Sequence, residues 1–356
     1  MKDLRSEFPA LAHQTYLNNA ATGLLSKSLA AWRKQHDLDF LEQGADYMQR
    51  KEMIEQTRRS VAQMWGAREM ETSLIPNFSY AINLVWGGIP KGQKVLMLEE
   101  DYPSVRWPVE TRDFDVCYAK IDENLETNIQ EAIEKHHPDI LIFSIVQWQS
   151  GIKIDLEFLK EMKAYHPSLL IIADGTQYLG TEAFDFRTSP IDVLAASGYK
   201  WLMAGFGNGL LLVKEEAQER IYPEVIGFNS AVGFDSQNIN TTFNRRFEPG
   251  HLDSFNFGSL NHAMKQISDI GIDQITEQLQ FLSAYAKELF LKKNVLSSSI
   301  ANRQQHSTIF NIKGDQSLYN TLRENQIICS LRGGGIRVSC HYYNTYDDLE
   351  RLGTFL

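Results

Sequence analysis

The stretch D-V-L-A-A-S-G-Y-K-W-L-M-A-G-F-G-N-G-L-L-L-V, residues 192–213, decides the fold. Its first part, residues 192–196, is a short apolar run typical of a buried strand, and the small pair Ser197-Gly198 interrupts that run just before Lys200. Three glycines then precede a second run of strand length, residues 210–213. The pattern predicts that Lys200 lies just after the end of a strand, in apolar surroundings. Because desolvation favours the neutral amine, Lys200 is a candidate Schiff-base nucleophile.

Length and composition indicate a globular protein of about two domains, since the chain has 356 residues and 43% of them are apolar. The formal net charge is -10 and no run of lysines and arginines occurs, which argues against nucleic-acid and anionic-membrane partners. The three cysteines lack C-x-x-C spacing, so neither a disulfide scaffold nor a metal site is predicted. We find no apolar signal core and no apolar stretch of about 18 residues, and therefore expect a cytoplasmic protein.

From residue 94 onward the sequence alternates between strand and helix patterns. The predicted strands lie at 95–98, 116–121, 140–146 and 169–173, and the intervening helices at 123–135 and 156–165. Continuous apolar runs separated by helices indicate parallel strands that are covered on both faces. We therefore predict an α/β fold built on a mostly parallel sheet of the seven-stranded type, which also includes the two runs of the opening stretch.

The segments on either side of this sheet complete a predicted two-domain organisation. An irregular lead-in is predicted over 1–27, followed by helices over 28–43, 51–65 and in the 80s. After an irregular crossing at 228–258, the pattern predicts a helix at 260–293, a strand at 308–312, a helix at 316–325, strands at 327–331 and 335–340, and a helix at 346–355. We assign 15–240 to a large domain, and 1–14 with 241–356 to a smaller α+β domain.

Polar residues collect where the predicted strands end, which is the edge at which open parallel sheets bind ligands. A lysine at a strand end is ordinarily a solvated surface residue, so the role of Lys200 depends on the polar residues at the other strand ends. They are Tyr102, the run Gln147 to Gln149, Asp174 with Gln177, Ser197 with Lys200, and Asn77 or Ser79 at the start of a helix. Together they describe a pocket with an anion site at a helix N-terminus, an aromatic face, a carboxylate and an amine. Pyridoxal 5′-phosphate needs that set for its phosphate, ring, pyridine nitrogen and aldehyde.

Four runs of sequence resemble the class V aminotransferase family in order and spacing. They are A-D-G-T-Q at 173–177, S-G-Y-K-W-L with G-F-G-N-G at 197–209, R-F-E-P-G at 246–250 and I-R-V-S-C-H-Y-Y-N-T at 336–345. The family belongs to the fold-type I pyridoxal-phosphate enzymes and includes cysteine desulfurases, selenocysteine lyases, kynureninases and isopenicillin-N-epimerase-like proteins. The resemblance extends over nearly the whole chain and implies a homodimer with a shared active site.

The resemblance also implies a role for individual residues around the cofactor. Lys200 would bind its aldehyde as the internal aldimine, Asp174 would pair with the pyridine nitrogen, and Gln177 would hydrogen-bond the ring hydroxyl. Tyr102 would stack on the ring where many relatives have histidine. The phosphate would be held by Ser79, Ser197 and the Phe78 amide. Tyr199 stands where many relatives have histidine, and His251 where relatives often have a threonine that reaches the partner subunit's phosphate; both keep a hydrogen-bonding group for the cofactor.

The substrate, an amino acid, would meet a second group of residues. Arg337 would bind its α-carboxylate through a bidentate guanidinium, and Asn19 and Trp148 would line its pocket. Structural roles stay open beside these: Asp174 as a turn residue, Ser79 as a helix cap, Tyr102 as ordinary packing, and Arg337 as the partner of a structural acid.

The reaction class that we expect first is transamination, with β-elimination or epimerisation as the alternative, because one lysine and one cofactor serve all three. A desulfurase that depends on a cysteine loop is disfavoured, since only G-G-G-I separates Arg332 from Arg337. A non-catalytic binder of the same fold would not need all of these cofactor residues. A nucleotide-binding protein would need a G-x-G-x-x-G or P-loop motif, which the sequence lacks.

Overall fold

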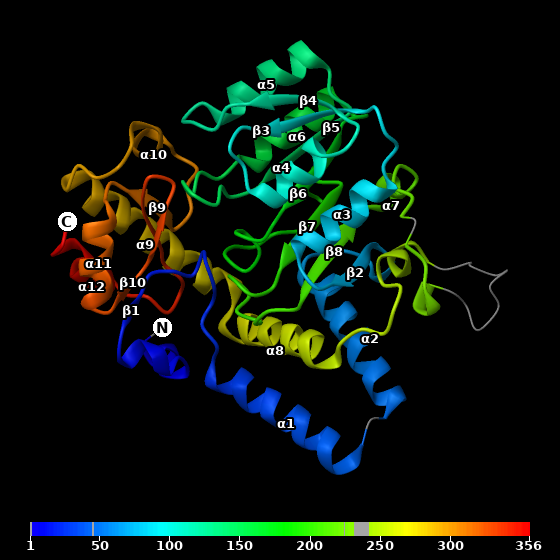
Figure 1. Cartoon of the computed structure of the whole chain (residues 1–356), viewed down its shortest axis with the longest axis horizontal. Coiled ribbons are helices and arrows are strands. Elements are labelled where there is room, and N and C mark those ends of the chain that lie inside the picture. Colours follow the sequence, from blue (N-terminus) through cyan, green and yellow to red (C-terminus); the bar gives the residue numbers. More distant parts are fainter. Residues whose placement is uncertain (1, 45, 224, 231–241) are drawn as a thin grey trace.

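A seven-stranded sheet forms the centre of the computed structural model, which describes residues 2–44, 46–223, 225–230 and 242–356 (Figure 1). Its strands are β2 (Thr72–Ile75), β3 (Lys94–Leu98), β4 (Asp115–Ala119), β5 (Ile140–Ser144), β6 (Leu170–Asp174), β7 (Val193–Ser197) and β8 (Gly209–Val213), in the order β2-β8-β7-β6-β5-β3-β4. Strands β3 to β7 pair in parallel, whereas β8 runs antiparallel to β7 and β2. The predicted mostly parallel α/β sheet is confirmed, and β2 is an additional strand that the sequence pattern did not predict.

Helices cover both faces of this sheet because its strands are apolar on both sides. They are α2 (Tyr47–Met64), α3 (Phe78–Gly88), α4 (Pro103–Glu110), α5 (Leu125–His136), α6 (Leu156–Tyr165), α7 (Glu215–Gln218) and α8 (Ser254–Ile270). Helix α1 (Lys27–Gln43) packs against α8 instead. Successive residues of β3 illustrate the two faces: Leu96 belongs to the core shared with α2, α5, α6 and α8, and Met97 to the core shared with α3 and α4. The carboxyl end of each strand is thereby fixed between two layers of helices.

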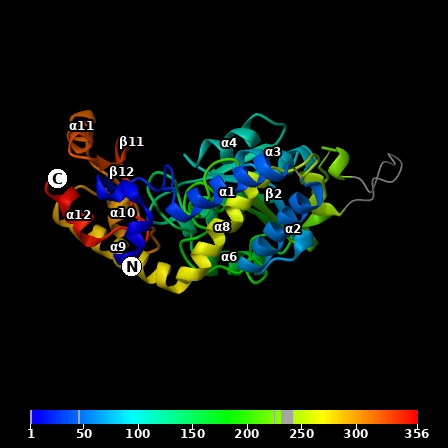
Figure 2. The ribbon, with the colours of Figure 1, turned by 90° about the horizontal axis from the view of Figure 1, so that it is seen from below.

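The C-terminal part of the chain forms a smaller α+β unit at one end of the molecule (Figures 1 and 2). It contains α9 (Ile272–Lys292), β9 (Ile309–Ile312), α10 (Ser298–Asn302), α11 (Gln316–Glu324), β10 (Ile327–Ile328), β11 (Ser330–Arg332), β12 (Gly335–Ser339) and α12 (Tyr346–Gly353). Three of its strands form an antiparallel sheet in the order β11-β12-β9, and β10 pairs in parallel with β1 (Thr15–Tyr16). A separate hydrophobic cluster fills this unit.

Two predictions for this region are wrong. The single helix expected over 260–293 is two helices, because Gly271 between α8 and α9 has a φ of 89°, which breaks a right-handed helix. The single strand expected over 327–331 is two strands, β10 and β11, that belong to different sheets.

The N-terminal segment is more regular than the lead-in that we predicted. Two short 3-10 helices, η1 (Lys2–Glu7) and η2 (Pro9–Ala12), precede β1. The predicted domain boundary between 240 and 241 lies outside the described residues, as does part of the predicted crossing at 228–258, and the domain division stays a prediction. Among the described helices, none is both long and apolar enough to cross a membrane.

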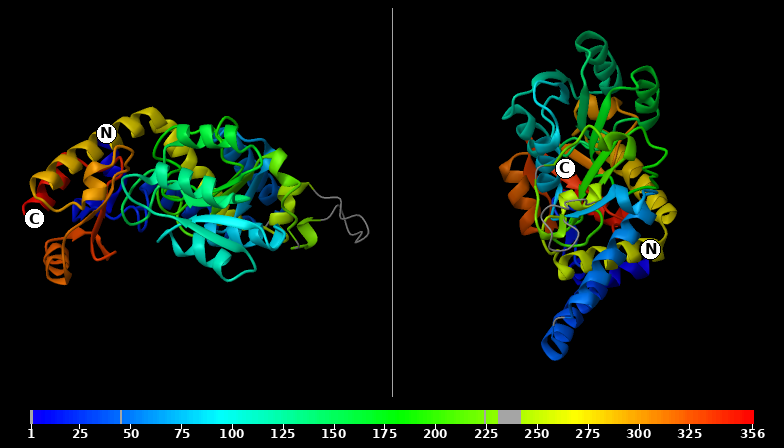
Figure 3. Two further views of the ribbon diagram at one scale, coloured as in Figure 1. Left: turned by 90° about the horizontal axis from the view of Figure 1, so that it is seen from above. Right: turned by 90° about the vertical axis from the view of Figure 1, so that its right-hand side faces the viewer.

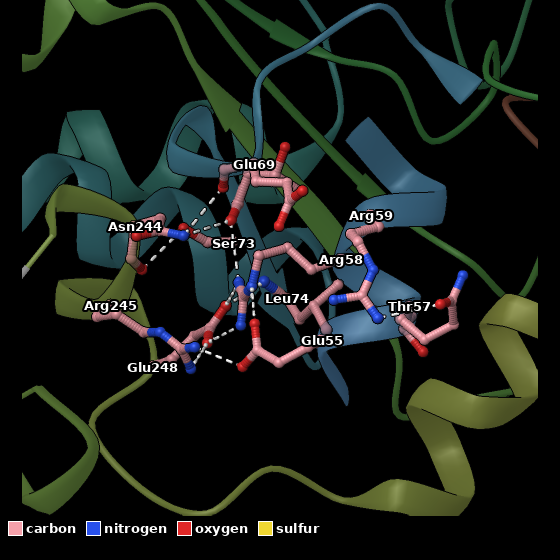
Figure 4. A network of polar contacts seen from close by, with 12 residues as sticks. Glu55, Thr57, Arg58, Arg59, Glu69, Ser73, Leu74, Asn244, Arg245 and Glu248 are labelled. Atoms are coloured by element: carbon pink, nitrogen blue, oxygen red, sulfur yellow. Dashed lines mark hydrogen bonds and ion pairs between the residues drawn. The ribbon is translucent and has the colours of Figure 1, made fainter. Parts of the chain in front are cut away.

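A buried ion pair anchors the strand that leads into α3 (Figure 4). Arg58 of α2 and Glu248 of the R-F-E-P-G run are 2% and 0% exposed, and their side chains form two parallel hydrogen bonds, one of 2.7 Å. Glu248 also accepts the backbone N–H of Leu74 at 2.6 Å, and Arg58 donates to the Thr72 carbonyl. The pair therefore ties α2 and the segment around Glu248 to β2, whose exit begins the wall of the pocket described next.

Candidate active site

A cavity of about 450 Å³ lies at the carboxyl ends of β6 and β7. Its lining residues come from several strand exits and from the start of α3: Asn77, Phe78, Ser79, Tyr102, Ser144, Trp148, Asp174, Thr176, Gln177, Ser197, Tyr199, Lys200, Phe206 and Gly207. The cavity brings together nine of the residues that the sequence predicted for the site: Phe78, Ser79, Tyr102, Trp148, Asp174, Gln177, Ser197, Tyr199 and Lys200. Asn19, His251 and Arg337 do not line it.

Lys200 lies three residues after β7 and is 6% exposed. The pKa of its amine is lowered to about 8, chiefly by burial and also by the charges of Arg337 and Arg332, with the Asp174 carboxylate opposing the shift. The Nζ atom lies 5.5 Å from the ring centroids of both Tyr102 and Tyr199. An amine in these surroundings spends a large share of its time neutral near pH 8, which is the form that attacks an aldehyde.

Asp174 is the last residue of β6, next to β7 in the sheet. Its carboxylate accepts the Thr176 backbone N–H at 2.8 Å, as in a turn, and it also lines the pocket, so the turn role and the site role coexist. Burial raises its pKa to about 6, while Lys200 lowers it. A buried carboxylate of this kind is stabilised by a cationic partner, which a protonated pyridine nitrogen would provide.

The start of α3 forms the end of the pocket that suits an anion. Asn77 is the helix cap, since its side chain accepts the Tyr80 backbone N–H at 2.9 Å, so the cap is Asn77 and not Ser79. Ser79 instead donates to Ser104 at 2.7 Å, and Ser197 accepts the Phe78 backbone N–H at 2.9 Å. Two hydroxyls and the first amides of a helix thus meet at one wall, as phosphate binding requires.

Gln177 is held from both sides while it lines the pocket. Its amide nitrogen donates to the Ala20 carbonyl at 3.0 Å, and its amide oxygen accepts from the Trp201 indole at 2.6 Å. Asn19, one residue before Ala20, accepts a hydrogen bond from the Tyr343 hydroxyl at 2.9 Å, and its buried Nδ2 has no partner among the described residues. The N-terminal segment therefore packs directly behind Gln177.

Arg337 lies on β12 of the smaller unit and is 2% exposed. One nitrogen of its guanidinium donates to the Trp148 carbonyl at 2.7 Å, and its buried Nε has no partner in the described parts of the chain. Burial lowers its pKa to about 10. No described carboxylate forms an ion pair with Arg337, so it is not the partner of a structural acid. Its neighbour Trp148 packs edge-on against Tyr102, with ring centroids 5.6 Å apart, and links Arg337 to the pocket.

His251 is a predicted site residue that lies outside this pocket. Its side chain is exposed, and its ring contacts Tyr47 and Phe228, with centroid distances of 5.8 and 5.6 Å. Its predicted approach to the phosphate of a partner subunit concerns a second chain and stays a prediction.

The predicted site residues leave out two buried residues that shape the pocket. Asp101 is 3% exposed, and its carboxylate accepts the backbone N–H groups of Tyr102 at 2.6 Å and Ser144 at 2.8 Å. Thr176 accepts the Ser197 backbone N–H at 3.1 Å and so joins the exits of β6 and β7. A carboxylate directly before Tyr102 and a threonine in D-G-T-Q were the available signals, but both residue types are common in turns.

The donor set fits pyridoxal 5′-phosphate. A helix start with two hydroxyls suits the phosphate, Asp174 suits the pyridine nitrogen, Tyr102 offers an aromatic face and Lys200 an amine. Several buried polar atoms at or next to the pocket have no partner among the described residues, namely Ser144 Oγ, Trp148 Nε1, Asn19 Nδ2 and Arg337 Nε. Buried polar groups are ordinarily paired, so these atoms indicate a polar ligand.

Comparison with known proteins identifies the family. Residues 15–352 match the family described as aminotransferase class V. The uncharacterized aminotransferase YcbU of Bacillus subtilis is 24% identical over 97% of this chain and 94% of its own, and the isopenicillin N epimerase of Amycolatopsis lactamdurans is 24% identical over 84% of this chain and 83% of its own.

A solved structure shows the same fold. The cysteine desulfurase from Thermococcus onnurineus has a TM-score of 0.87 and 20% identity, and the match covers 99% of this chain and 96% of that one. The arrangement of β2 to β8 is therefore that of the fold-type I enzymes. The chain belongs to the aminotransferase class V family, whose members are enzymes that use pyridoxal 5′-phosphate.

Proposed function

We propose that this enzyme is an aminotransferase that exchanges the amino group of an amino acid, with Lys200 as its covalent anchor for the cofactor. The observation that carries the proposal is a buried amine of lowered pKa that shares one pocket with the Asp174 carboxylate. When bound there, pyridoxal phosphate supplies an electrophilic aldehyde and a ring that accepts electrons from the substrate α-carbon.

Each neighbouring residue has a distinct task in this proposal. Lys200 Nζ takes and returns the proton of the substrate α-carbon, for which a pKa near neutrality is suited. Asp174 keeps the pyridine nitrogen protonated, and its own burial makes the loss of that cation costly. Arg337 binds the α-carboxylate through its guanidinium, whose buried Nε has no hydrogen-bond partner among the described residues. Tyr102 and Trp148 form an aromatic wall that excludes water from the reacting atoms.

β-Elimination or epimerisation is the second candidate function, because the same residues serve it and a similar protein is named as an epimerase. Cysteine-dependent desulfuration has less support. All three cysteines are buried, and burial raises the pKa of each thiol, for Cys329 to about 11. The segment between Arg332 and Arg337 is a tight hairpin turn, with positive φ at Gly333 and Gly334, rather than a mobile loop that could bring a thiol to the cofactor.

We further infer that the active form is a cytoplasmic homodimer. Helix α1 extends away from the sheet (Figure 3, right) and buries only Leu29 among its 17 residues. Large apolar side chains are exposed near its end and on the rim of the pocket, including Leu41 at 80%, Met48 at 65% and Phe206 at 65%. Such surfaces on a single chain favour a protein partner, and light scattering of the purified enzyme tests for a dimer.

The reaction class is tested by incubating the cofactor-loaded enzyme with individual amino acids, with and without an acceptor keto acid. Transamination predicts that sustained keto-acid formation requires the acceptor. Sustained keto-acid and ammonia release without an acceptor would instead identify a lyase, and inversion of the α-carbon without keto acid would identify an epimerase.

A further inference from the structure

The hairpin formed by β11 and β12 presents two arginines on one face. In its antiparallel register Ser330 pairs with Arg337, and Arg332 pairs with Gly335. Cross-strand partners and alternate residues of a strand lie on the same face of a sheet, so Arg332 and Arg337 share a face. Ile336 lies on the opposite face, in the hydrophobic cluster of the smaller unit. The arginine face therefore points away from that cluster, toward the loop with Trp148, to which Arg337 is bonded.

The tip of the hairpin is fixed against that same loop. A side chain at Gly333 would collide with the Gln149 amide oxygen, since an added Cβ would lie 2.1 Å from it. Asn311, the β9 partner of Arg337, donates a hydrogen bond to the Arg332 carbonyl at 2.9 Å. Gly335 is closely packed as well, because an added Cβ would lie 2.3 Å from the Asn311 amide oxygen. The backbone on both sides of the turn is thus held in place, and with it the position of Arg332.

The Arg332 guanidinium is free to take a ligand. It is exposed, and it forms no hydrogen bond or ion pair with any residue that the structure describes. Its charge nevertheless reaches the site, because it contributes to the lowered pKa values of both Lys200 and Arg337. A bound amino acid uses Arg337 for its α-carboxylate, and the pyridine nitrogen uses Asp174. Arg332 is then the cation that remains without a counter-charge.

A second cavity, lined by the three glycines that directly follow Arg332, offers a place for the substrate side chain. It has a volume of about 300 Å³, and Trp148 lines both this cavity and the cofactor pocket. Gln149, Asn311 and residues 333–335 of the hairpin also line it. Its charged lining residues are Glu100 and Lys313, which are of opposite sign.

We propose that Arg332 determines substrate specificity by binding an anionic group at the end of the substrate side chain, which makes acidic amino acids the preferred substrates. This inference rests on the proposed function, because it concerns the substrate of that same site. It assigns Arg337 to the α-carboxylate and Arg332 to the distal acid.

The test compares acid and amide substrates of nearly equal shape, glutamate with glutamine and aspartate with asparagine, on the cofactor-loaded enzyme. Charge-assisted hydrogen bonds give about ten- to hundred-fold effects, so we expect kcat/KM to favour the acid by that factor. Arg332→Gln is expected to lower the acid-to-amide ratio at least about tenfold, and Arg332→Lys to restore part of it. Arg187→Gln is the matched control, because Arg187 is also exposed but lies in the connection between β6 and β7, and its ratio should equal that of the wild type.

An equilibrium measurement separates this inference from the proposed reaction. Calorimetry should give tighter binding of glutarate than of butyrate by the wild-type enzyme, and Arg332→Gln should remove that difference. An unchanged acid-to-amide ratio and unchanged glutarate affinity in Arg332→Gln would overturn the inference, as would a wild-type preference for the amides. If no amino acid reacts, the proposed function fails, whereas the two dissociation constants still decide the role of Arg332.

Discussion

Lys200 of the cofactor-free protein should titrate more than two pH units below an ordinary lysine. Its pKa is lowered from 10.5 to about 8, chiefly by burial and also by Arg337 and Arg332, with partial opposition from Asp174. At pH 7 a pKa of 8 leaves about one tenth of the amine neutral, against about one part in 3,000 for a pKa of 10.5. The neutral fraction of the buried amine at pH 7 is thus about 300 times that of an exposed lysine.

The assay is the rate at which the cofactor-free protein captures pyridoxal phosphate, followed by absorbance from pH 6 to pH 10. The same rate is measured in the same buffers for free lysine whose α-amino and α-carboxyl groups are blocked. In the ratio of the two rates, the effect of cofactor ionisation on the rate cancels. The neutral amine is the reactive form, so the ratio should be constant below pH 8 and fall about tenfold per pH unit above it, once Lys200 is fully neutral. A ratio that stays constant up to pH 10 would refute the argument.

Two variants test the electrostatic origin of this pKa because they act in opposite directions. Asp174→Asn removes the charge that raises the Lys200 pKa, so the break in the pH profile should move to lower pH. Arg337→Gln removes a charge that lowers it, and the break should move to higher pH. Breaks that move in the same direction in both variants would contradict this assignment.

Three further perturbations have expected outcomes. Asp174→Asn should still bind the cofactor at Lys200 but lose at least about 100-fold in kcat, as removal of a preorganised charge does; near wild-type turnover would show that the pyridine nitrogen has another partner. Glu248→Ala should lower the free energy of unfolding in urea by about 3–5 kcal/mol, because it leaves Arg58 buried and unpaired, whereas the exposed control Glu219→Ala should change it by less than about 0.5 kcal/mol. Replacing all three cysteines by alanine should leave kcat within about threefold, since the thiols are buried and their pKa values are raised, and a loss of 100-fold or more would restore a sulfur-transfer mechanism.

The sheet and the polar residues at the ends of its strands could be predicted because buried parallel strands are continuous apolar runs. The strand before Asp174 and the one before Lys200 are examples, and both are fully buried. Strand β2, T-S-L-I, was not predicted because half of its residues are polar, although all four are buried where the sheet meets the Arg58–Glu248 pair. The helix break at Gly271 was not predicted because the helical spacing of apolar residues continues on both sides of it.

The candidate site was predictable where one residue carries its own chemistry and not where tertiary contacts create it. Lys200 and Asp174 stand directly after strands, so their positions follow from the pattern. Asp101 acquires its role from the backbone N–H of Ser144, 43 positions away in the chain. Arg332 depends on the register of a hairpin and on the loop that its turn meets, and the sequence indicated only its closeness to Arg337.

The central claim, that Lys200 anchors the cofactor, is tested most directly by borohydride reduction of the purified, cofactor-loaded protein followed by peptide mass spectrometry. The account predicts visible-wavelength absorption that disappears on reduction, together with one pyridoxyl group per chain on residue 200. Attachment to a different lysine, or a protein that Lys200→Ala leaves equally coloured and equally reducible, would contradict it.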